Sequence, residues 1–186
     1  MHSVTVCDLL HSVSVQHIYT AGRENRSFEN FIEILKQYSV EMIVDIRKDS
    51  ESDPDPSFRL DWLRTGIMNA GMIYHWAAMQ LGGIRPEVAN SRHRALKNTS
   101  LRGFADFMDT DPFQRGLNKL IHLAEHSLLL LGDSENPEDC HRSLISDYLL
   151  IRKIEVIHLL VPGKDKKHVL NSHARIEESL IVYDIN

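Results

Sequence analysis

Short runs of apolar, often β-branched residues alternate along this chain with longer stretches in which apolar residues recur every three or four positions. The first pattern is typical of buried strands and the second of amphipathic helices. We predict strands at 15–21, 42–46, 72–76, 128–131 and 155–161, and helices at 28–35, 60–69, 104–108, 111–126 and 136–153. Strands that alternate with helices form a mostly parallel sheet covered on both faces. The sequence therefore predicts a three-layer, Rossmann-like α/β fold with a mostly parallel five-stranded sheet.

The length and charge of the chain limit both its domain organisation and its partners. Its 186 residues suit one domain, spanning 1–186, in which residues 164–186 form a C-terminal extension, either a hairpin or a docked tail. The net charge is -5 and the pI is about 6.1. Proteins that grip a nucleic-acid backbone usually carry a basic surface, so nucleic acid is a disfavoured partner.

The cysteine count and the hydropathy pattern bear on the cellular compartment. Cys7 and Cys140 are the two cysteines; they allow one disulfide but no disulfide framework, so a reducing compartment is the simpler interpretation. No apolar run approaches the roughly 20 residues needed to cross a bilayer. The N-terminal residues 1–15 lack the basic start and sustained apolar stretch of a signal peptide. We therefore expect a cytoplasmic protein without a membrane partner.

The predicted topology places a binding site at one edge of the sheet. In open α/β sheets, ligands bind beyond the carboxyl ends of the strands, where the strand order reverses. The usual reversal puts the first strand beside the fourth, which brings together the loops that begin at Gly22 and Gly132. With the end of the second strand, these loops supply the predicted ligand-binding residues Gly22, Arg23, Asn25, Arg26, Asp45, Arg47, Gly132 and Arg142. The arginines suit a small-molecule anion that is nucleotide-like or otherwise carries phosphate, although no glycine-rich nucleotide motif is present.

Two residues near the last predicted helix start are candidates for catalysis. Asn136 and Pro137 are favourable at a helix start, and Cys140 and His141 follow them. His141 suits acid–base chemistry because the pKa of histidine lies near neutrality; the alternative is a hydrogen bond to a loop carbonyl. Cys140 is suited to the role of nucleophile because the N-terminus of a helix lowers the pKa of a thiol. Against this, free cysteine is commonly a small buried residue, and adjacent helical residues do not face each other.

Other polar residues also have two interpretations. Arg26 and Arg142 either clamp an anion or tie loops together, and Asp45 either orients those arginines, binds a ribose hydroxyl or fastens its own loop. His122 and His126 lie four residues apart, a spacing compatible with a metal ion. The residues between them do not form the zinc-protease motif. His126 lies at the end of the predicted helix, where a positively charged side chain interacts favourably with the helix dipole. We therefore predict no metal site.

Several sequence blocks resemble one protein family. The blocks are IYTAGRENRSFENFIEIL (18–35), IVDIR (43–47), LGGIRP (81–86), RGFADFM (102–108) and NPEDCHRSLISDYL (136–149). Taken together, they resemble the family called domain of unknown function 488. The resemblance implies a three-layer α/β fold and a pocket built from these loops, but no activity, because the family is largely uncharacterised.

The chain also departs from that family. Members commonly carry a cysteine at the end of the fourth strand and a glutamate two residues later, where this chain has Gly132 and Ser134. The first loop usually contains Gly-His-Ser, where this chain has Gly22-Arg23-Glu24. The cluster Cys140-His141-Arg142 is retained. Chemistry that needs the missing cysteine or histidine is not expected here.

Three functional hypotheses remain open on the sequence. The first is an enzyme for a phosphate-bearing small molecule, with His141 as the proton carrier. The second is a non-catalytic ligand-sensing module, which the missing family residues favour. The third is an interaction module that meets a protein or nucleic acid through the acidic loop 47–57 and the basic segment 85–97. The sequence identifies no cofactor and does not decide whether the protein is an enzyme. It is compatible with a homodimer.

Overall fold

The computed structural model describes residues 17–83 and 85–185, and these residues are built around one central sheet. Its strands are β1 (His17–Gly22), β2 (Met42–Asp45), β3 (Ile73–Trp76), β4 (Leu128–Gly132), β5 (Glu155–Val161) and β6 (Lys164–Lys167). They lie in the order β3-β2-β4-β1-β5-β6, and every neighbouring pair is parallel except β5 and β6. The predictions for Cys7 and for the first two residues of strand 15–21 fall outside the described residues.

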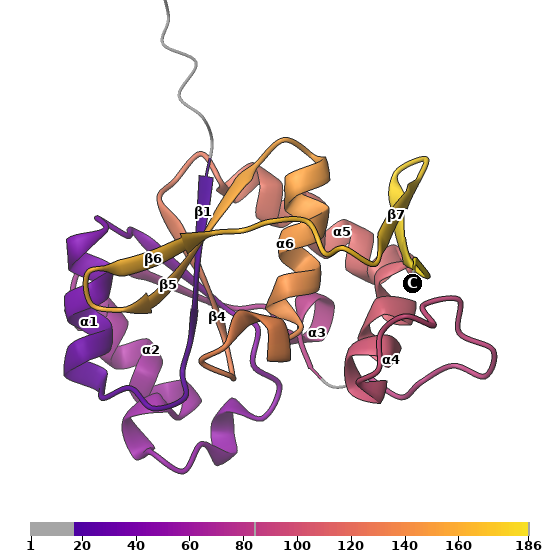
Figure 1. The fold of residues 1–186 in the computed structure, drawn as a ribbon. Coiled ribbons are helices and arrows are strands. Elements are labelled where there is room, and N and C mark those ends of the chain that lie inside the picture. The colour runs from indigo at the N-terminus through magenta and orange to yellow at the C-terminus, as the bar shows by residue number, and fades with distance from the viewer. Residues whose placement is uncertain (1–16, 84, 186) are drawn as a thin grey trace, which may run out of the picture.

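Helices cover both faces of the sheet. They are α1 (Phe28–Gln37), α2 (Leu60–Asn69), α3 (Ala78–Leu81), α4 (Thr99–Met108), α5 (Asp111–Leu123) and α6 (Arg142–Ile151), with short 3-10 turns at Ser50–Ser52, Pro56–Phe58 and Pro137–Asp139. The apolar faces of α1 and α2 pack on one side of the sheet, and α3 to α6 pack on the other (Figure 1). The predicted three-layer α/β fold is confirmed.

The sheet has six strands, one more than we predicted, because the chain returns after β5. A turn at Pro162–Gly163 leads into β6, which pairs antiparallel with β5. The four residues of β6 are Lys-Asp-Lys-Lys and all are exposed, so no apolar alternation marks them as a strand. Beyond β6, a separate hairpin is formed by β7 (Ala174–Glu177) and β8 (Leu180–Tyr183).

The helix predicted over 136–153 is broken at its start. Asn136 caps only the short turn Pro137–Asp139, where its side chain accepts a hydrogen bond from the backbone N–H of Glu138. Cys140 then adopts an extended backbone, with φ -123° and ψ 141°, and α6 begins at Arg142. The prediction of one continuous helix was therefore wrong, and Cys140 lies in the connection between two helical segments.

Helix α4 begins earlier than the predicted 104–108. The side chain of Asn98 accepts hydrogen bonds from the backbone N–H groups of Ser100 and Leu101, which caps the helix. This extra turn places the N-terminus of α4 near the carboxyl edge of the sheet, where Ser100 and Asn98 line a hollow with residues that follow β2 and β4.

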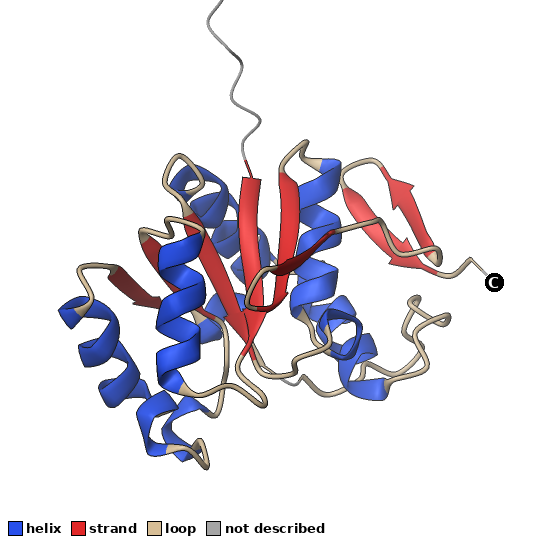
Figure 2. Ribbon diagram, turned by 60° about the vertical axis from the view of Figure 1, so that its left-hand side comes forward, coloured by secondary structure: helices blue, strands red, loops and turns tan. Residues whose placement is uncertain are grey.

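The strand order reverses between β1 and β4, as predicted. α1 follows β1 on one face and α6 follows β4 on the other, so the two crossovers lead to opposite sides of the sheet. The loops that leave these strands stay paired: Arg23 N–H donates to Gly132 O at 2.9 Å, and Glu24 N–H to Asp133 O at 3.0 Å. The carboxyl ends of both strands lie together at the lower edge in Figure 2.

A buried network of polar side chains links β1, β5 and α6 to the segment that follows β6. Thr20 Oγ1 lies 2.6 Å from His158 Nδ1, His158 Nε2 lies 2.9 Å from His168 Nδ1, and His168 Nε2 lies 2.9 Å from Asp147 Oδ1. Asp147 also accepts a hydrogen bond from the Tyr183 hydroxyl at 2.9 Å. With His158 neutral, every contact from Thr20 to Asp147 can join a hydrogen-bond donor to an acceptor.

This buried network of side chains predicts that the protein loses stability as the pH falls. Burial, followed by the charges of His168, Arg142 and Lys166, lowers the pKa of His158 to about 3. The unfolded chain binds this proton near pH 6.5, so the stabilisation is complete above that pH and is lost as the pH falls toward 3. We expect His158 to account for about 2 kcal/mol of lost unfolding free energy between about pH 7 and about pH 4.5.

Denaturant unfolding across this pH range measures the effect. His158→Gln should flatten the pH dependence, whereas the exposed His122→Gln should leave it unchanged. An equal acid loss in the wild type and in His158→Gln would contradict the assignment.

Candidate functional site

A hollow of about 330 Å³ opens at the carboxyl edge of the sheet, beside the loop that follows β4. Its walls come from the ends of β2 and β4, from the N-terminus of α4 and from the connection before α6. The lining residues are Lys48, Asp49, Gly83, Asn98, Ser100, Leu101, Asp133, Ser134, Asp139, Cys140 and His141. We call this hollow the edge pocket. It brings the two predicted catalytic residues together with polar side chains from four separate segments.

The extended backbone at Cys140 lets its side chain face that of the next residue. Cys140 Sγ lies 3.8 Å from His141 Nδ1, within reach of a hydrogen bond to sulfur. The objection that adjacent helical residues diverge does not apply, because Cys140 precedes the helix. The other side of the His141 ring packs against Phe104, with ring centroids 4.8 Å apart. These contacts hold the thiol and the imidazole as a pair.

The surroundings of Cys140 favour its thiolate form. Burial raises the pKa of the thiol, but the hydrogen bond and charge of His141, with the charge of Arg142, lower it more, and the pKa falls to about 6. A thiol with an ordinary pKa near 8.5 is mostly protonated at neutral pH. Although Cys140 is only 4% exposed, it borders the edge pocket and is deprotonated at neutral pH.

The second ring nitrogen of His141 lacks a protein partner. His141 is 7% exposed, and its Nε2 is buried without a hydrogen bond to any described residue. A buried polar atom of this kind is costly to leave unpaired. Because Nδ1 faces Cys140 and the residue lines the edge pocket, Nε2 is the atom available to a bound molecule.

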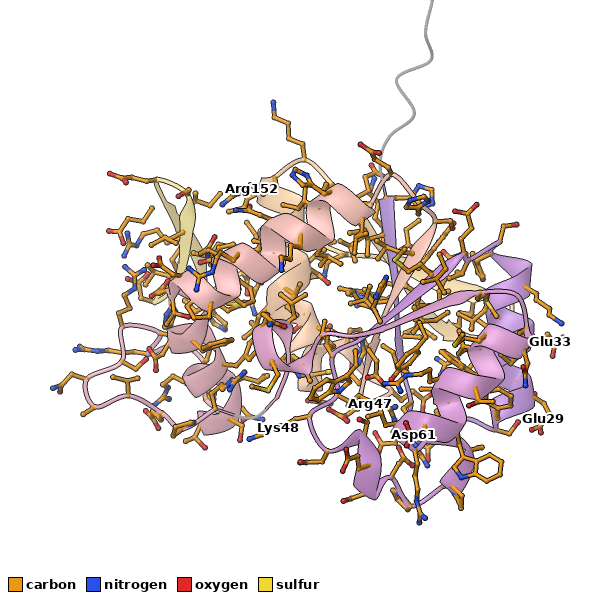
Figure 3. All side chains as sticks on the ribbon, turned by 180° about the vertical axis from the view of Figure 1, so that it is seen from behind. Glu29, Glu33, Arg47, Lys48, Asp61 and Arg152 are labelled. Carbon is orange, nitrogen blue, oxygen red and sulfur yellow. The ribbon has the colours of Figure 1, made fainter. Side chains whose placement is uncertain are left out.

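Positive charge reaches the edge pocket from two sources. Lys48 lies three residues beyond the end of β2 and lines the pocket; Figure 3 shows it in the lower half of the molecule, near Arg47. The ten-residue helix α4 begins at the pocket and carries no acidic residue in its first turn. The N-terminus of a helix attracts anions, and acidic side chains there would offset that attraction.

Three carboxylates also border the edge pocket: Asp49, Asp133 and Asp139. Enclosure by protein atoms, together with the nearby charges of Asp45 and Asp49, raises the pKa of Asp133, and the charge of His141 opposes that rise. The Asp133 side chain still reaches solvent. The pocket therefore offers hydrogen-bond acceptors as well as positive charge.

The guanidinium groups of Arg26 and Arg142 donate to backbone carbonyls of the adjoining loops and of β5. Arg26 donates to Gly22 O at 2.7 Å and to the two carbonyls of Leu159 and Leu160. Arg142 donates to Ser134 O, and to Glu135 O at 2.8 Å. The loops around these arginines do meet at one edge, but the charged groups lie within the loops rather than in the edge pocket. Arg142 Nε remains without a partner among the described residues.

Arg47 is also held within the protein. It is 1% exposed and binds both carboxylate oxygens of Asp45, at 3.0 and 2.7 Å, and Asp53 at 2.9 Å. Asp45 accepts a further hydrogen bond from the Tyr74 hydroxyl at 2.6 Å. Arg23 lies 2.5 Å from the other oxygen of Asp53. This network joins the end of β2 to the loop before α2.

Two predicted ligand-binding glycines allow parts of the chain to approach closely. A Cβ atom on Gly22 would lie 1.9 Å from Ser134 O, which no real contact permits. A Cβ atom on Gly132 would lie 2.7 Å from Cys140 Sγ. The remaining predicted residue, Asn25, has φ 59° and donates to the Glu135 carboxylate at 3.1 Å. These three residues position the two loops against each other.

Several pocket residues were not predicted from the sequence, chiefly Lys48, Asn98, Ser100 and Asp133. Lys48 and Asp133 directly follow the predicted residues Arg47 and Gly132. Their position near the ends of predicted strands was the sequence signal that could have identified them as pocket residues. Asn98 lies before the predicted helix 104–108, although Asn followed by Thr and Ser is a good N-cap pattern. An earlier start for α4 would have brought Asn98 and Ser100 into consideration.

The described residues contain neither a potential metal-ligand cluster nor a helix that could span a membrane. Among them, no group of three or more His, Cys, Asp or Glu side chains is placed to hold a metal ion. His126 instead lies 3.5 Å from the carboxylate of Glu41, an exposed contact. None of the helices in the described part combines the length and apolar character needed to span a bilayer.

The chain matches the family model of domain of unknown function DUF488 over residues 27–149. The match covers more than half of the chain. The chain belongs to the DUF488 family. No curated protein and no solved structure matches the chain.

The DUF488 match runs from Ser27, the N-cap of α1, to Leu149 within α6. All the residues that line the edge pocket fall inside it. Strand β1 and the C-terminal strands from β5 onward lie outside it. The DUF488 description names no activity, so the function has to be argued from the site.

Proposed function

We propose that this DUF488 protein binds a small phosphate-bearing molecule in the edge pocket, with Cys140 and His141 facing that molecule. The observation that carries the proposal is His141 Nε2, a buried polar atom in the pocket wall without a partner among the described residues. A ligand oxygen at this position would complete the hydrogen bonding of the imidazole. His141 would thereby connect the ligand to the Cys140 thiolate.

The charges around the pocket favour a ligand with two kinds of polar group. Lys48 and the N-terminus of α4 suit a phosphate, because both attract negative charge. Asp49, Asp133 and Asp139 suit hydroxyl groups that donate hydrogen bonds. A nucleotide or a sugar phosphate carries both. In this proposal the anion is held at Lys48, and Arg26, Arg47 and Arg142 shape the loops around it.

Cys140 and His141 are also suited to catalysing a reaction of the bound molecule. Cys140 supplies a thiolate at neutral pH, and His141 can accept or donate a proton through Nε2. The 4% exposure of Cys140 favours a second candidate, a sensing module in which the ligand contacts His141 and the thiol does not react. Turnover of an identified ligand would separate the two, since a sensing module releases its ligand unchanged.

A thermal-shift panel of nucleotides, sugar phosphates and inorganic phosphate tests the binding proposal. A ligand at about 100 times its Kd should raise Tm by about 5 °C or more. Lys48→Ala should weaken that ligand about tenfold, because it removes a charge from the phosphate end. Lys119→Ala, at an exposed position on α5, should leave the affinity unchanged.

The proposal would be wrong if no phosphorylated compound raised Tm. It would also be wrong if Lys48→Ala and Lys119→Ala bound an identified ligand equally well.

A further inference from the structure

The two edges of the central sheet differ in how they meet solvent. The β6 edge carries Lys164, Asp165, Lys166 and Lys167, all exposed. Charged residues, lysine above all, keep an edge strand from pairing with another chain. The opposite edge is β3, whose sequence Ile-Tyr-His-Trp contains no lysine, no acidic residue and no proline. The β3 edge therefore lacks the protection that the β6 edge has.

The backbone of β3 presents free hydrogen-bonding groups outward. Ile73 N–H donates to Glu41 O and Ala77 N–H donates to Asp45 O, so residues 73, 75 and 77 face β2. By strand alternation, the N–H and C=O groups of Tyr74 and Trp76 point away from the sheet. Within the described part of the chain, no backbone or side-chain group bonds to them.

Apolar side chains surround this free edge. Ile73 is 49% exposed and Trp76 40%, and Met68 and Met79 flank them from the adjoining α2 and α3. Together they leave on the order of 400 Å² of side-chain area exposed around this edge, and we call these four residues the apolar patch. A standard interface buries about 800 Å² per partner, which the apolar patch, the strand backbone and neighbouring polar groups can supply together.

We propose that β3 pairs antiparallel with β3 of a second copy of this chain across a two-fold axis at His75. In that register Tyr74 of one copy lies opposite Trp76 of the other, and their outward backbone groups meet in hydrogen-bonded pairs. The aromatic rings of those residues form two cross-strand pairs, which stabilise a sheet. The pairing is self-complementary, as a two-fold interface requires.

The existing contacts of these side chains are compatible with pairing. Tyr74 donates its hydroxyl to Asp45, and Trp76 Nε1 donates to Arg47 O at 3.2 Å. Both bonds lie on the β2 side and hold the rings in place before association. Because the β6 edge is protected by charge, the assembly closes at two copies and does not extend into a fibre.

Sedimentation analysis over a micromolar concentration series tests this interface. The wild-type chain should sediment as a species of twice the 21.4 kDa chain mass. His75→Glu and His75→Lys each place two like charges opposite one another at the axis, so each variant alone should be monomeric. A mixture of the two variants should associate again, because the carboxylate introduced in one chain would then face the ammonium group introduced in the other. This result also excludes misfolding as the cause of dissociation.

Lys164→Glu on β6 is the matched control and should leave the dimer intact. A monomeric wild type, dissociation caused by Lys164→Glu, or a mixture of the His75 variants that stays monomeric would each overturn the proposal.

Discussion

Replacing Arg47 by alanine should lower the unfolding free energy by about 3–5 kcal/mol, because the change leaves buried carboxylates without their partner. Arg47 binds both oxygens of Asp45 and one oxygen of Asp53, and it also donates to Phe58 O at 3.0 Å. Asp45 is fully buried, so water cannot replace the lost guanidinium. Denaturant unfolding of the variant and the wild type measures the difference.

The size of this effect separates two roles for Arg47. Arg64→Ala is the control, since Arg64 pairs with Asp61 at the surface and its removal should cost less than about 1 kcal/mol. If Arg47 served mainly to hold a ligand, Arg47→Ala would fold with nearly wild-type stability and bind phosphorylated compounds poorly. A loss below about 1 kcal/mol would therefore reject the structural role that the contacts assign to it.

Replacing His141 should have the largest effect on reactivity at the site. With a pKa of about 6, Cys140 is mostly thiolate at neutral pH. Without the imidazole, burial would leave the thiol at or above its ordinary pKa near 8.5, and only a few per cent would be ionised. We expect His141→Phe to slow alkylation of Cys140 at neutral pH by about tenfold or more.

The choice of phenylalanine keeps the ring that packs on Phe104 and removes both nitrogens. The experiment uses a Cys7→Ser background, so that a single thiol reacts. His122→Phe, on α5 and outside the pocket, is the control and should leave the rate unchanged. An unchanged alkylation rate in His141→Phe would show that Cys140 does not depend on its neighbour.

The sequence predicted the layers of the fold and the convergence of the β1 and β4 loops, because both follow from hydrophobic periodicity and parallel-strand topology. It did not predict β6, since a charged edge strand carries no apolar alternation. The break at Cys140 was also missed, because Asn136 and Pro137 favour a helix start without specifying how long that helix continues.

The candidate site was predictable in its location and less so in its chemistry. Cys140 and His141 were identified from residue type and position, and they do lie at the carboxyl edge. The arginines were expected to face a ligand, yet the direction of a long side chain depends on which carbonyls and carboxylates the fold places nearby. Lys48 and the N-terminus of α4 could be assigned to the edge pocket only from the tertiary structure.

The decisive experiment on the Cys140–His141 pair is a pH titration of the Cys140 thiolate, followed by its ultraviolet absorbance in a Cys7→Ser background. It reports the ionisation of the thiol itself and does not depend on how easily a reagent reaches a nearly buried sulfur. The account predicts a midpoint near pH 6 that moves above about 8 in His141→Phe. A wild-type midpoint at or above about 8.5, unchanged by the substitution, would contradict the claim that Cys140 and His141 form an activated pair.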